Sequence, residues 1–175
     1  KLNVLMPIDV IVAALNDYQP EALSTYPSFV RVLAREQLSG RLHIAPRLIR
    51  TGAETLTEEV RDQAADVWGI PVINSYACTE AGSMGQECGH ADGMHLAEDL
   101  FIFEVADADG RSVPDGVKGS KLLVTSLTNR TLPLVRYELS DIVTKAVEPC
   151  PCGLPFWRIA SIDGRREEVL RFSRR

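Results

Sequence analysis

The sequence predicts an α/β fold in which a parallel βαβ layer is followed by a small antiparallel β-barrel or sheet subdomain. The first part of the chain alternates apolar segments at helical spacing with short strand-like segments. Short joints link a strand, a helix and another strand between Arg47 and Tyr76, which is typical of a βαβ unit with parallel strands. After Gly82 the chain offers short strands separated by turn residues.

The first part should contain helices over residues 8–15, 26–40 and 55–68, with strands at 47–50 and 72–76. Apolar residues recur at helical spacing from Ile8 to Leu15. Pro27 suits the first turn of the second helix, and Gly40 ends it. The sequence Thr-Leu-Thr-Glu at 55–58 has the spacing of a capping box, so the third helix should begin there and end at Gly69.

The second part should consist of strands joined by Asp-Gly and Asn-Arg turns. We place the α/β part at residues 1–85, the antiparallel part at 86–163 and the start of a hinge at 164–175. The expected strands of the antiparallel part are Leu100–Val105, Lys121–Ser126, Leu134–Tyr137, Ile142–Ala146 and Phe156–Ile162.

The composition is that of an ordinary globular protein, with 45% hydrophobic and 25% charged residues and a net charge of −5. Basic residues are scattered, whereas a nucleic-acid-binding surface needs clustered ones. No apolar run approaches the length of a membrane helix, and no signal peptide is visible. We therefore expect a cytoplasmic protein that binds neither nucleic acid nor membrane. The chain starts at Lys1 and stops after a charged stretch, so we expect an internal fragment of a longer protein.

A polar segment, NSYACTEAG (74–82), follows the second strand of the βαβ unit, where α/β sheets usually bind ligands. Asn74 can pair with an adenine edge and Tyr76 can stack on the base. Thr79 can donate to a phosphate oxygen, and Glu80 can hold a hard cation such as Mg²⁺. The small residues of the segment let the backbone approach a ligand. A strand that merely ends in a polar turn would look similar, and from chemistry alone it is the commoner case.

The segment resembles the N-x-Y-G-x-T-E motif of adenylate-forming enzymes. YPSF at 26–29 and LVTSLTNRTLPLVRYELSD at 123–141 are similar to the phenylacetate–CoA ligase branch of that family. The resemblance implies that Asn74 contacts the adenine amino group and that Tyr76 stacks on adenine. It also implies that Thr79 binds the AMP phosphate and Glu80 binds Mg²⁺. Ala77 replaces the usual glycine, and its methyl group is expected either to be tolerated or to shift the loop beside the acyl group.

Three further motifs follow the family's order. T-G-A-E at 51–54 resembles the G-G-E segment, which implies that Gly52, Ala53 and Glu54 line the adenine and acyl pocket. R-Y-E-L-S-D at 136–141 resembles R-Y-x-T-G-D, which implies that Asp141 binds the ribose hydroxyls; here serine stands at 140 in place of glycine. G-R-R-E at 164–167 resembles G-R-x-D, which implies that Arg165 approaches the ribose and phosphate. The hinge position of that motif is glutamate in this chain, at residue 167.

The cysteines and histidines suggest a metal site. Cys88, His95, Cys150 and Cys152 form a Cys₃His set, which suits a closed tetrahedral zinc site, although unrelated buried cysteines would look alike. The same arrangement is found in the phenylacetate–CoA ligase relatives that the chain resembles. His90 competes with His95 as the fourth ligand, and the resemblance of GMHLAED (93–99) to those relatives favours His95. We expect one structural Zn²⁺ per chain.

The implied reaction joins a carboxylic acid, an aryl acid such as phenylacetate, to AMP from ATP and then transfers the acyl group to coenzyme A. Thr79 and Glu80 would stabilise charge on the phosphate. The family's phosphate-binding loop and its lysine-bearing C-terminal domain are absent from these residues, so the chain alone should bind AMP weakly and lack ligase activity. A homodimer is a possible assembly.

Two alternatives remain open at this point. One is a zinc-stabilised scaffold that has lost adenylation, as the substitutions at Ala77, Ser140 and Glu167 would allow. The other is an adenylating enzyme that passes the acyl group to an amine or a carrier-protein thiol.

Overall fold

The structure is a computed structural model, and it describes residues 2–90 and 92–165. The chain divides into two compact units, Lys1–Tyr76 and Ala77–Arg175, and the division falls inside a strand. The expected boundary between residues 85 and 86 lies further along the chain and remains a prediction. The expected hinge residue Glu167 lies outside the described residues.

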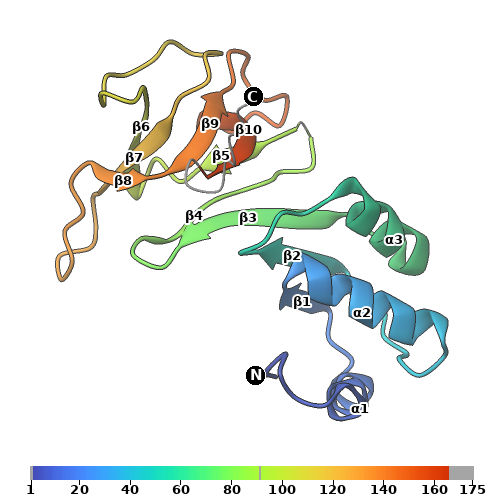
Figure 1. Cartoon of the computed structure of the whole chain (residues 1–175). Helices are drawn as coiled ribbons and strands as arrows, with labels where there is room; N and C mark the ends of the chain where they lie inside the picture. The colour runs from blue at the N-terminus through green and yellow to red at the C-terminus, as the bar shows by residue number, and fades with distance from the viewer. Residues whose placement is uncertain (1, 91, 166–175) are drawn as a thin grey trace, which may run out of the picture. The chain divides into compact units, whose positions relative to one another are not determined.

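The first unit is a parallel sheet with helices between its strands (Figure 1). The parallel pairing of β2 (Leu48–Gly52) with β3 (Val72–Cys78) confirms the predicted βαβ arrangement, and β1 (Ala22–Thr25) also pairs with β2 in parallel. Strand β1 is an addition to the prediction, because its four residues are too short to show a clear pattern. The elements are α1 (Ile8–Tyr18), β1 (Ala22–Thr25), α2 (Pro27–Leu38), β2 (Leu48–Gly52), α3 (Glu58–Trp68) and β3 (Val72–Cys78).

Two apolar clusters hold this unit together. In the first, Ile11 and Leu15 of α1 pack against Leu33 of α2. In the second, Val30 of α2 and Val60 of α3 pack against β2 and β3 through Ile49 and Val72. Helix α2 therefore contributes to both clusters and joins α1 to the sheet.

The start of α3 differs from the prediction. Its N-cap is Thr57 and no side-chain capping hydrogen bond is formed there, so the expected capping box at 55–58 is wrong. Leu56 is buried in the second apolar cluster, and this burial fixes where the chain turns into the helix. The end is as predicted, because Gly69 adopts a left-handed conformation with φ of 68°.

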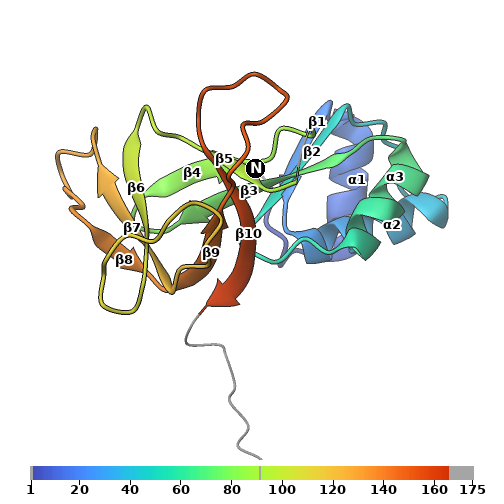
Figure 2. The same ribbon diagram turned by 90° about the horizontal axis from the view of Figure 1, so that it is seen from above.

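The second unit is antiparallel, as predicted. One sheet has the order β4-β5-β10-β9 and the other β6-β7-β8 (Figure 2). The described strands are β4 (Gly82–Gln86), β5 (Met94–Leu96), β6 (Phe101–Ala106), β7 (Lys121–Ser126), β8 (Tyr137–Leu139), β9 (Asp141–Lys145) and β10 (Arg158–Arg165).

Three of these strands depart from the expectations. The strand expected at 134–137 begins only at Tyr137, because Arg136 has a φ of 49° and is not extended. Strands β4 and β5 were not expected. The sequence of β4, GSMGQ, is rich in glycine and polar residues, and β5 has only three residues.

Strand β10 links two regions of the second unit. Its first residue, Arg158, pairs with His95 of β5, and its last residue, Arg165, pairs with Asp141 of β9. Among the described residues, no helix is long and apolar enough to cross a membrane.

Candidate functional site

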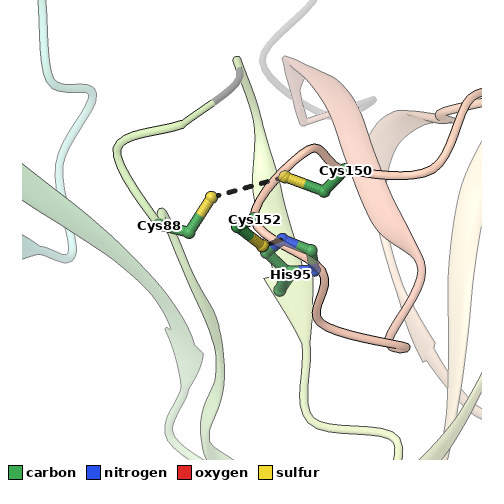
Figure 3. Close-up of side chains that lie close together, drawn as sticks. All are labelled: Cys88, His95, Cys150 and Cys152. Atoms are coloured by element: carbon green, nitrogen blue, oxygen red, sulfur yellow. Dashed lines mark hydrogen bonds between the residues drawn. The ribbon is translucent and has the colours of Figure 1, made fainter.

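The second unit gathers Cys88, His95, Cys150 and Cys152 into one cluster, termed the Cys₃His cluster (Figure 3). Cys88 follows β4, His95 lies in β5, and both Cys150 and Cys152 lie in the turn between β9 and β10. The candidate ligand atoms all lie within 4.8 Å of one another. His90 is exposed and outside the cluster, so the fourth position is taken by His95.

The spacing of these atoms fits a tetrahedral zinc ion. Zinc–sulfur bonds of about 2.3 Å put two sulfurs about 3.8 Å apart, and a sulfur and an imidazole nitrogen about 3.6 Å apart. The Sγ atoms of Cys88 and Cys150 are 3.6 Å apart, and Cys152 Sγ is 3.3 Å from His95 Nε2. For these two pairs, closing around an ion would require movements of only a few tenths of an ångström, and the remaining pairs of ligand atoms are at most 4.8 Å apart.

The orientation of His95 also suits metal binding. Its Nδ1 lies 2.9 Å from the carbonyl oxygen of Phe156. Since a carbonyl only accepts hydrogen bonds, Nδ1 carries the proton, and Nε2 is left with its lone pair toward the cysteines. A hydrogen bond of this kind commonly holds histidine ligands of metals. His95 is 5% exposed, so the ring is fixed by packing as well.

Two glycines shape the cluster. Gly153 has a φ of 80°, and its backbone N–H bonds to the carbonyl of Cys150 at 3.2 Å, which closes the turn that presents two thiols. Gly93 lies just before β5, and a Cβ there would overlap the carbonyl oxygen of Ile159 in β10. Without a side chain at Gly93, β5 and β10 can approach closely enough to bring His95 to the turn.

The Cys150 thiol is surrounded by the two other thiols of the cluster, and its pKa is raised. A hydrogen bond from the Cys152 backbone lowers the pKa of the Cys150 thiol, but burial and hydrogen bonds with the Cys152 and Cys88 thiols raise it above its ordinary value. A cavity of about 320 Å³, lined in part by Cys88, His95 and Phe156, adjoins the cluster and offers a way in for an ion.

The residues predicted to bind a nucleotide are divided between the two units. In the first unit, β2 and β3 place Thr51 opposite Asn74. The Oδ1 atom of Asn74 accepts hydrogen bonds from the Thr51 hydroxyl at 3.2 Å and from the Ser75 backbone at 3.0 Å. These bonds fix the Asn74 amide at the end of the parallel sheet. Tyr76 follows on the same strand and is buried.

In the segment 52–54, the predicted site residue Glu54 also has a structural role. The Glu54 carboxylate accepts hydrogen bonds from the backbone N–H of Ser28 at 3.0 Å and from its hydroxyl at 3.1 Å. Ser28 lies in the first turn of α2, where N–H groups lack helical partners and the helix dipole favours a negative charge. Glu54 therefore caps α2. Next to it, Gly52 ends β2, and Ala53 has a left-handed φ of 67°.

In the second unit, Ala77, Thr79 and Glu80 lie exposed at the end of β3 and in the turn to β4. Ala77 is part of the extended strand and is not one of the three non-glycine residues with positive φ among those described. Its backbone therefore does not require glycine. Ser140, which replaces the other glycine of the resemblance, likewise has no positive φ.

The Glu80 carboxylate is kept ionised by its surroundings. Hydrogen bonds from its own backbone amide and from the Tyr137 hydroxyl, together with the nearby positive charge of Arg165, lower its pKa below the ordinary value. The same bond raises the pKa of Tyr137, which remains a neutral donor. Partial burial raises the pKa of the neighbouring Cys78 thiol, so this cysteine is not an activated nucleophile.

Asp141 and Arg165 are brought together by the pairing of β9 with β10. Arg165 Nε lies 3.4 Å from Asp141 Oδ1, and the aspartate is buried whereas the arginine is exposed. Two motifs that lie apart in the sequence thus meet at one position.

No protein-family model matches the chain. The chain is 33% identical over 168 residues to the phenylacetate-coenzyme A ligase of Thermus thermophilus, and 34% identical over 168 residues to that of Pseudomonas putida, covering 91% of this chain in both cases. The chain is a phenylacetate–CoA ligase homologue. It spans 37% of the length of each of these relatives.

The solved structure of 2-hydroxyisobutyryl-CoA ligase in complex with R3-HIB-AMP matches 97% of this chain and 38% of that chain, with a TM-score of 0.85 and 22% identity. This likeness shows that the homologue has the fold of an adenylate-forming ligase domain.

Sequence reasoning missed two features of the homologue. Tyr137 lies inside the R-Y-E-L-S-D motif but was given no role. Its position in the sequence, between the predicted phosphate-binding segment and the predicted ribose ligand Asp141, could have drawn attention to it. The capping of α2 by Glu54 gave no signal, because it joins residues that only the folded sheet brings together.

Proposed function

We propose that this chain is part of an ATP-dependent carboxylate–CoA ligase that forms an acyl-AMP and then an acyl-CoA. The observation that carries the proposal is the 33–34% identity to two phenylacetate–CoA ligases over 91% of the chain. The names of these relatives favour an aryl acid such as phenylacetate as the substrate. A cytoplasmic location and a homodimer remain predictions.

The first half-reaction joins the acid to AMP. A carboxylate oxygen of the acid forms a bond to the α-phosphorus of ATP, and the bond from that phosphorus to the pyrophosphate oxygen breaks. The Thr79 hydroxyl, exposed in the turn after β3, donates a hydrogen bond to an α-phosphate oxygen and stabilises the charge that develops there. The ionised Glu80 carboxylate suits Mg²⁺, which is commonly held by one or two carboxylates and the substrate phosphates. When bound, Mg²⁺ neutralises phosphate charge.

The resemblance to adenylate-forming enzymes gives each of the predicted nucleoside-binding residues its own role. The Asn74 amide, fixed by its bonds to Thr51 and Ser75, pairs with the adenine amino group. Tyr76 stacks on the base, and the segment 52–54 lines the adenine and acyl pocket. Asp141 accepts hydrogen bonds from the ribose hydroxyls, and Arg165 beside it adds positive charge near the ribose and phosphate.

In the second half-reaction the sulfur of coenzyme A forms a bond to the acyl carbon, and the bond from that carbon to the AMP oxygen breaks. The acyl group leaves as a thioester and AMP is released. The same Thr79 hydroxyl stabilises the AMP phosphate as it departs.

The full-length protein tests the proposal. Pyrophosphate release that depends on an aryl acid, followed by acyl-CoA formation on addition of coenzyme A, is the expected result. Thr79→Ala should lower the rate of adenylation by about 100-fold or more, as loss of a charge-stabilising donor does in other enzymes. Absence of pyrophosphate release across a panel of carboxylic acids would overturn the proposal. The chain alone is expected to release none.

We also propose that the Cys₃His cluster holds one structural Zn²⁺. The fit of its sulfur and nitrogen spacings to a tetrahedron, and the proton on His95 Nδ1, support this proposal. All four positions are filled by side chains, which is typical of a structural rather than a catalytic site. Such an ion would tie the segment after β4 to the turn between β9 and β10.

The alternative hypothesis, that the protein is a scaffold that has lost adenylation, is based on the substitutions at Ala77, Ser140 and Glu167. Since neither Ala77 nor Ser140 occupies a backbone conformation that requires glycine, these two changes do not by themselves imply a lost site. An adenylating enzyme with another acceptor is distinguished by assaying product formation with and without coenzyme A.

A further inference from the structure

The thiols of Cys88 and Cys150 face each other although the two residues are distant in sequence (Figure 3). Cys88 follows β4, and Cys150 lies in the turn between β9 and β10, so the contact lies within the second unit. Their Sγ atoms are 3.6 Å apart. Because a disulfide bond is about 2.0 Å long, the two sulfurs need to approach by roughly 1.6 Å to form one, which is the scale of a small side-chain rotation.

The arrangement of the other thiols favours this pair over its competitors. The Sγ of Cys152 lies 3.3 Å from Nε2 of His95, so this thiol is directed toward the imidazole. A bridge between Cys150 and Cys152, which are separated by one residue, would close a small and strained ring. Cys78 lies outside the cluster. Cys88 and Cys150 are therefore the two thiols that the fold prepares for each other.

The two thiols differ in their access to small molecules. Cys88 is half-buried and lines the cavity of about 320 Å³ that adjoins the cluster. A water molecule occupies about 30 Å³ in the liquid, so a hydroperoxide of similar size fits this cavity. Cys150 is only 8% exposed. An oxidant that enters the cavity thus meets Cys88 first, with Cys150 placed to react next.

We propose that Cys88 and Cys150 form an oxidation site for small hydroperoxides, which closes reversibly to a disulfide when the cluster holds no metal. With hydrogen peroxide, the Cys88 sulfur bonds to one peroxide oxygen and the O–O bond breaks. The second oxygen leaves with the thiol proton as water, and Cys88 becomes a sulfenic acid.

The second step consumes the sulfenic acid. The Cys150 sulfur bonds to the Cys88 sulfur, the S–O bond of the sulfenic acid breaks, and the hydroxyl leaves with the Cys150 proton as a second water. Two thiols are thereby oxidised to one disulfide, and one hydrogen peroxide is reduced to two waters. A dithiol reductant reverses the change by thiol–disulfide exchange.

The disulfide and a bound metal exclude each other, because metal ligation needs the same sulfurs as thiolates. Both would tie the segment after β4 to the turn between β9 and β10. Oxidation would therefore keep this connection in the metal-free protein while it blocks uptake of the ion. The oxidation site depends on the thiols alone, and neither adenylation nor the presence of zinc is needed for it.

Mass spectrometry of the full-length protein tests the proposal. The protein is freed of metal with a chelator and treated with hydrogen peroxide, its remaining thiols are alkylated, and it is digested. The main product should be a peptide pair linked through Cys88 and Cys150, with both thiols restored by dithiothreitol. Cys152→Ser and the matched control Cys78→Ser should form the same link, whereas Cys88→Ser should form none.

Zinc uptake is a second readout, and it needs no variant. Oxidised wild-type protein should take up no Zn²⁺ at the cluster, and reduction should restore uptake. Zn²⁺ added before the peroxide should slow formation of the link, since both need the same thiols.

The outcomes separate this proposal from the zinc site. A main product that links either cysteine to Cys78 or Cys152, or that carries sulfinic or sulfonic acid without a link, overturns the oxidation site. Full Zn²⁺ uptake by the oxidised protein also overturns it. Reduced wild-type protein that takes up no Zn²⁺ overturns the zinc site instead, and the linked peptide then still decides whether Cys88 and Cys150 form the oxidation site.

Discussion

Arg165 lies directly opposite Asp141 in the pairing of β10 with β9, and its Nε is 3.4 Å from Asp141 Oδ1. The aspartate side chain is buried, at 7% exposure. Loss of the aspartate charge at this position should therefore weaken nucleotide binding.

Asp141→Asn in the full-length protein should weaken AMP binding by about 10- to 100-fold, because hydrogen bonds to a charged acceptor contribute about 1.5–3 kcal/mol. Isothermal titration calorimetry with AMP measures the change. Asp109→Asn breaks an exposed aspartate–arginine pair, that with Arg111, and should leave AMP affinity unchanged. Equal losses in both variants would show that the effect is general electrostatics and not a ribose contact.

Removal of one zinc ligand should release the metal and destabilise the chain. We expect about one Zn²⁺ per wild-type chain by elemental analysis and little in Cys150→Ser, with a fall in Tm of roughly 10 °C or more. Cys78→Ser is the control, since Cys78 lies outside the Cys₃His cluster. His95→Ala and His90→Ala form a second matched pair, in which only the first should lose zinc. Retention of zinc by both cysteine variants would contradict the site.

Ala53→Gly should stabilise the first unit. Ala53 has a φ of 67°, a conformation that costs an L-residue roughly 1–2 kcal/mol and glycine almost nothing. The greater freedom of glycine in the unfolded chain offsets about 0.4–1 kcal/mol of this gain. Thermal denaturation should therefore show a slightly higher Tm. Ala13→Gly, at an exposed position inside α1, should instead lower stability by about 1 kcal/mol.

Glu54→Gln and Ser28→Ala should destabilise the protein by about 1 kcal/mol each, because each removes part of the cap on α2. The double variant should lose less than the sum of the single losses, since both act through one interaction. Denaturant unfolding of the chain measures all three. If the losses of unfolding free energy in the two single variants simply added in the double variant, Glu54 and Ser28 would act independently. Glu54 would then not serve as the cap of α2.

The fold could be predicted from the sequence where a local pattern of apolar residues extends over a long segment. Helices α1 and α3 carry apolar residues at regular spacing, and Gly69 marks the end of α3. Strands β4 and β5 escaped prediction because they are short, and what defines them is pairing with each other and with β10. The start of β8 was misplaced because nothing in the sequence indicates the left-handed conformation of Arg136.

The site was predicted only in part for a similar reason. The four residues of the Cys₃His cluster could be singled out because thiols and imidazoles are few in the chain, and because the resemblance of GMHLAED to the phenylacetate–CoA ligase relatives favours His95 over His90. The pairing of Arg165 with Asp141 depends on tertiary structure. Common residue types such as tyrosine and arginine carry no sign of such partners in the sequence.

Strand β10 gives the second unit one further property. Its first residue pairs with a cluster ligand, His95, and its last with Asp141, across an eight-residue strand that spans about 25 Å at 3.3 Å per residue. If the metal orders the first end, the two sites are thermodynamically linked. Zinc depletion would then lower AMP affinity although no zinc ligand contacts the nucleotide. Reciprocally, AMP would slow the loss of zinc to a chelator, because linkage requires each ligand to change the other's affinity by the same factor.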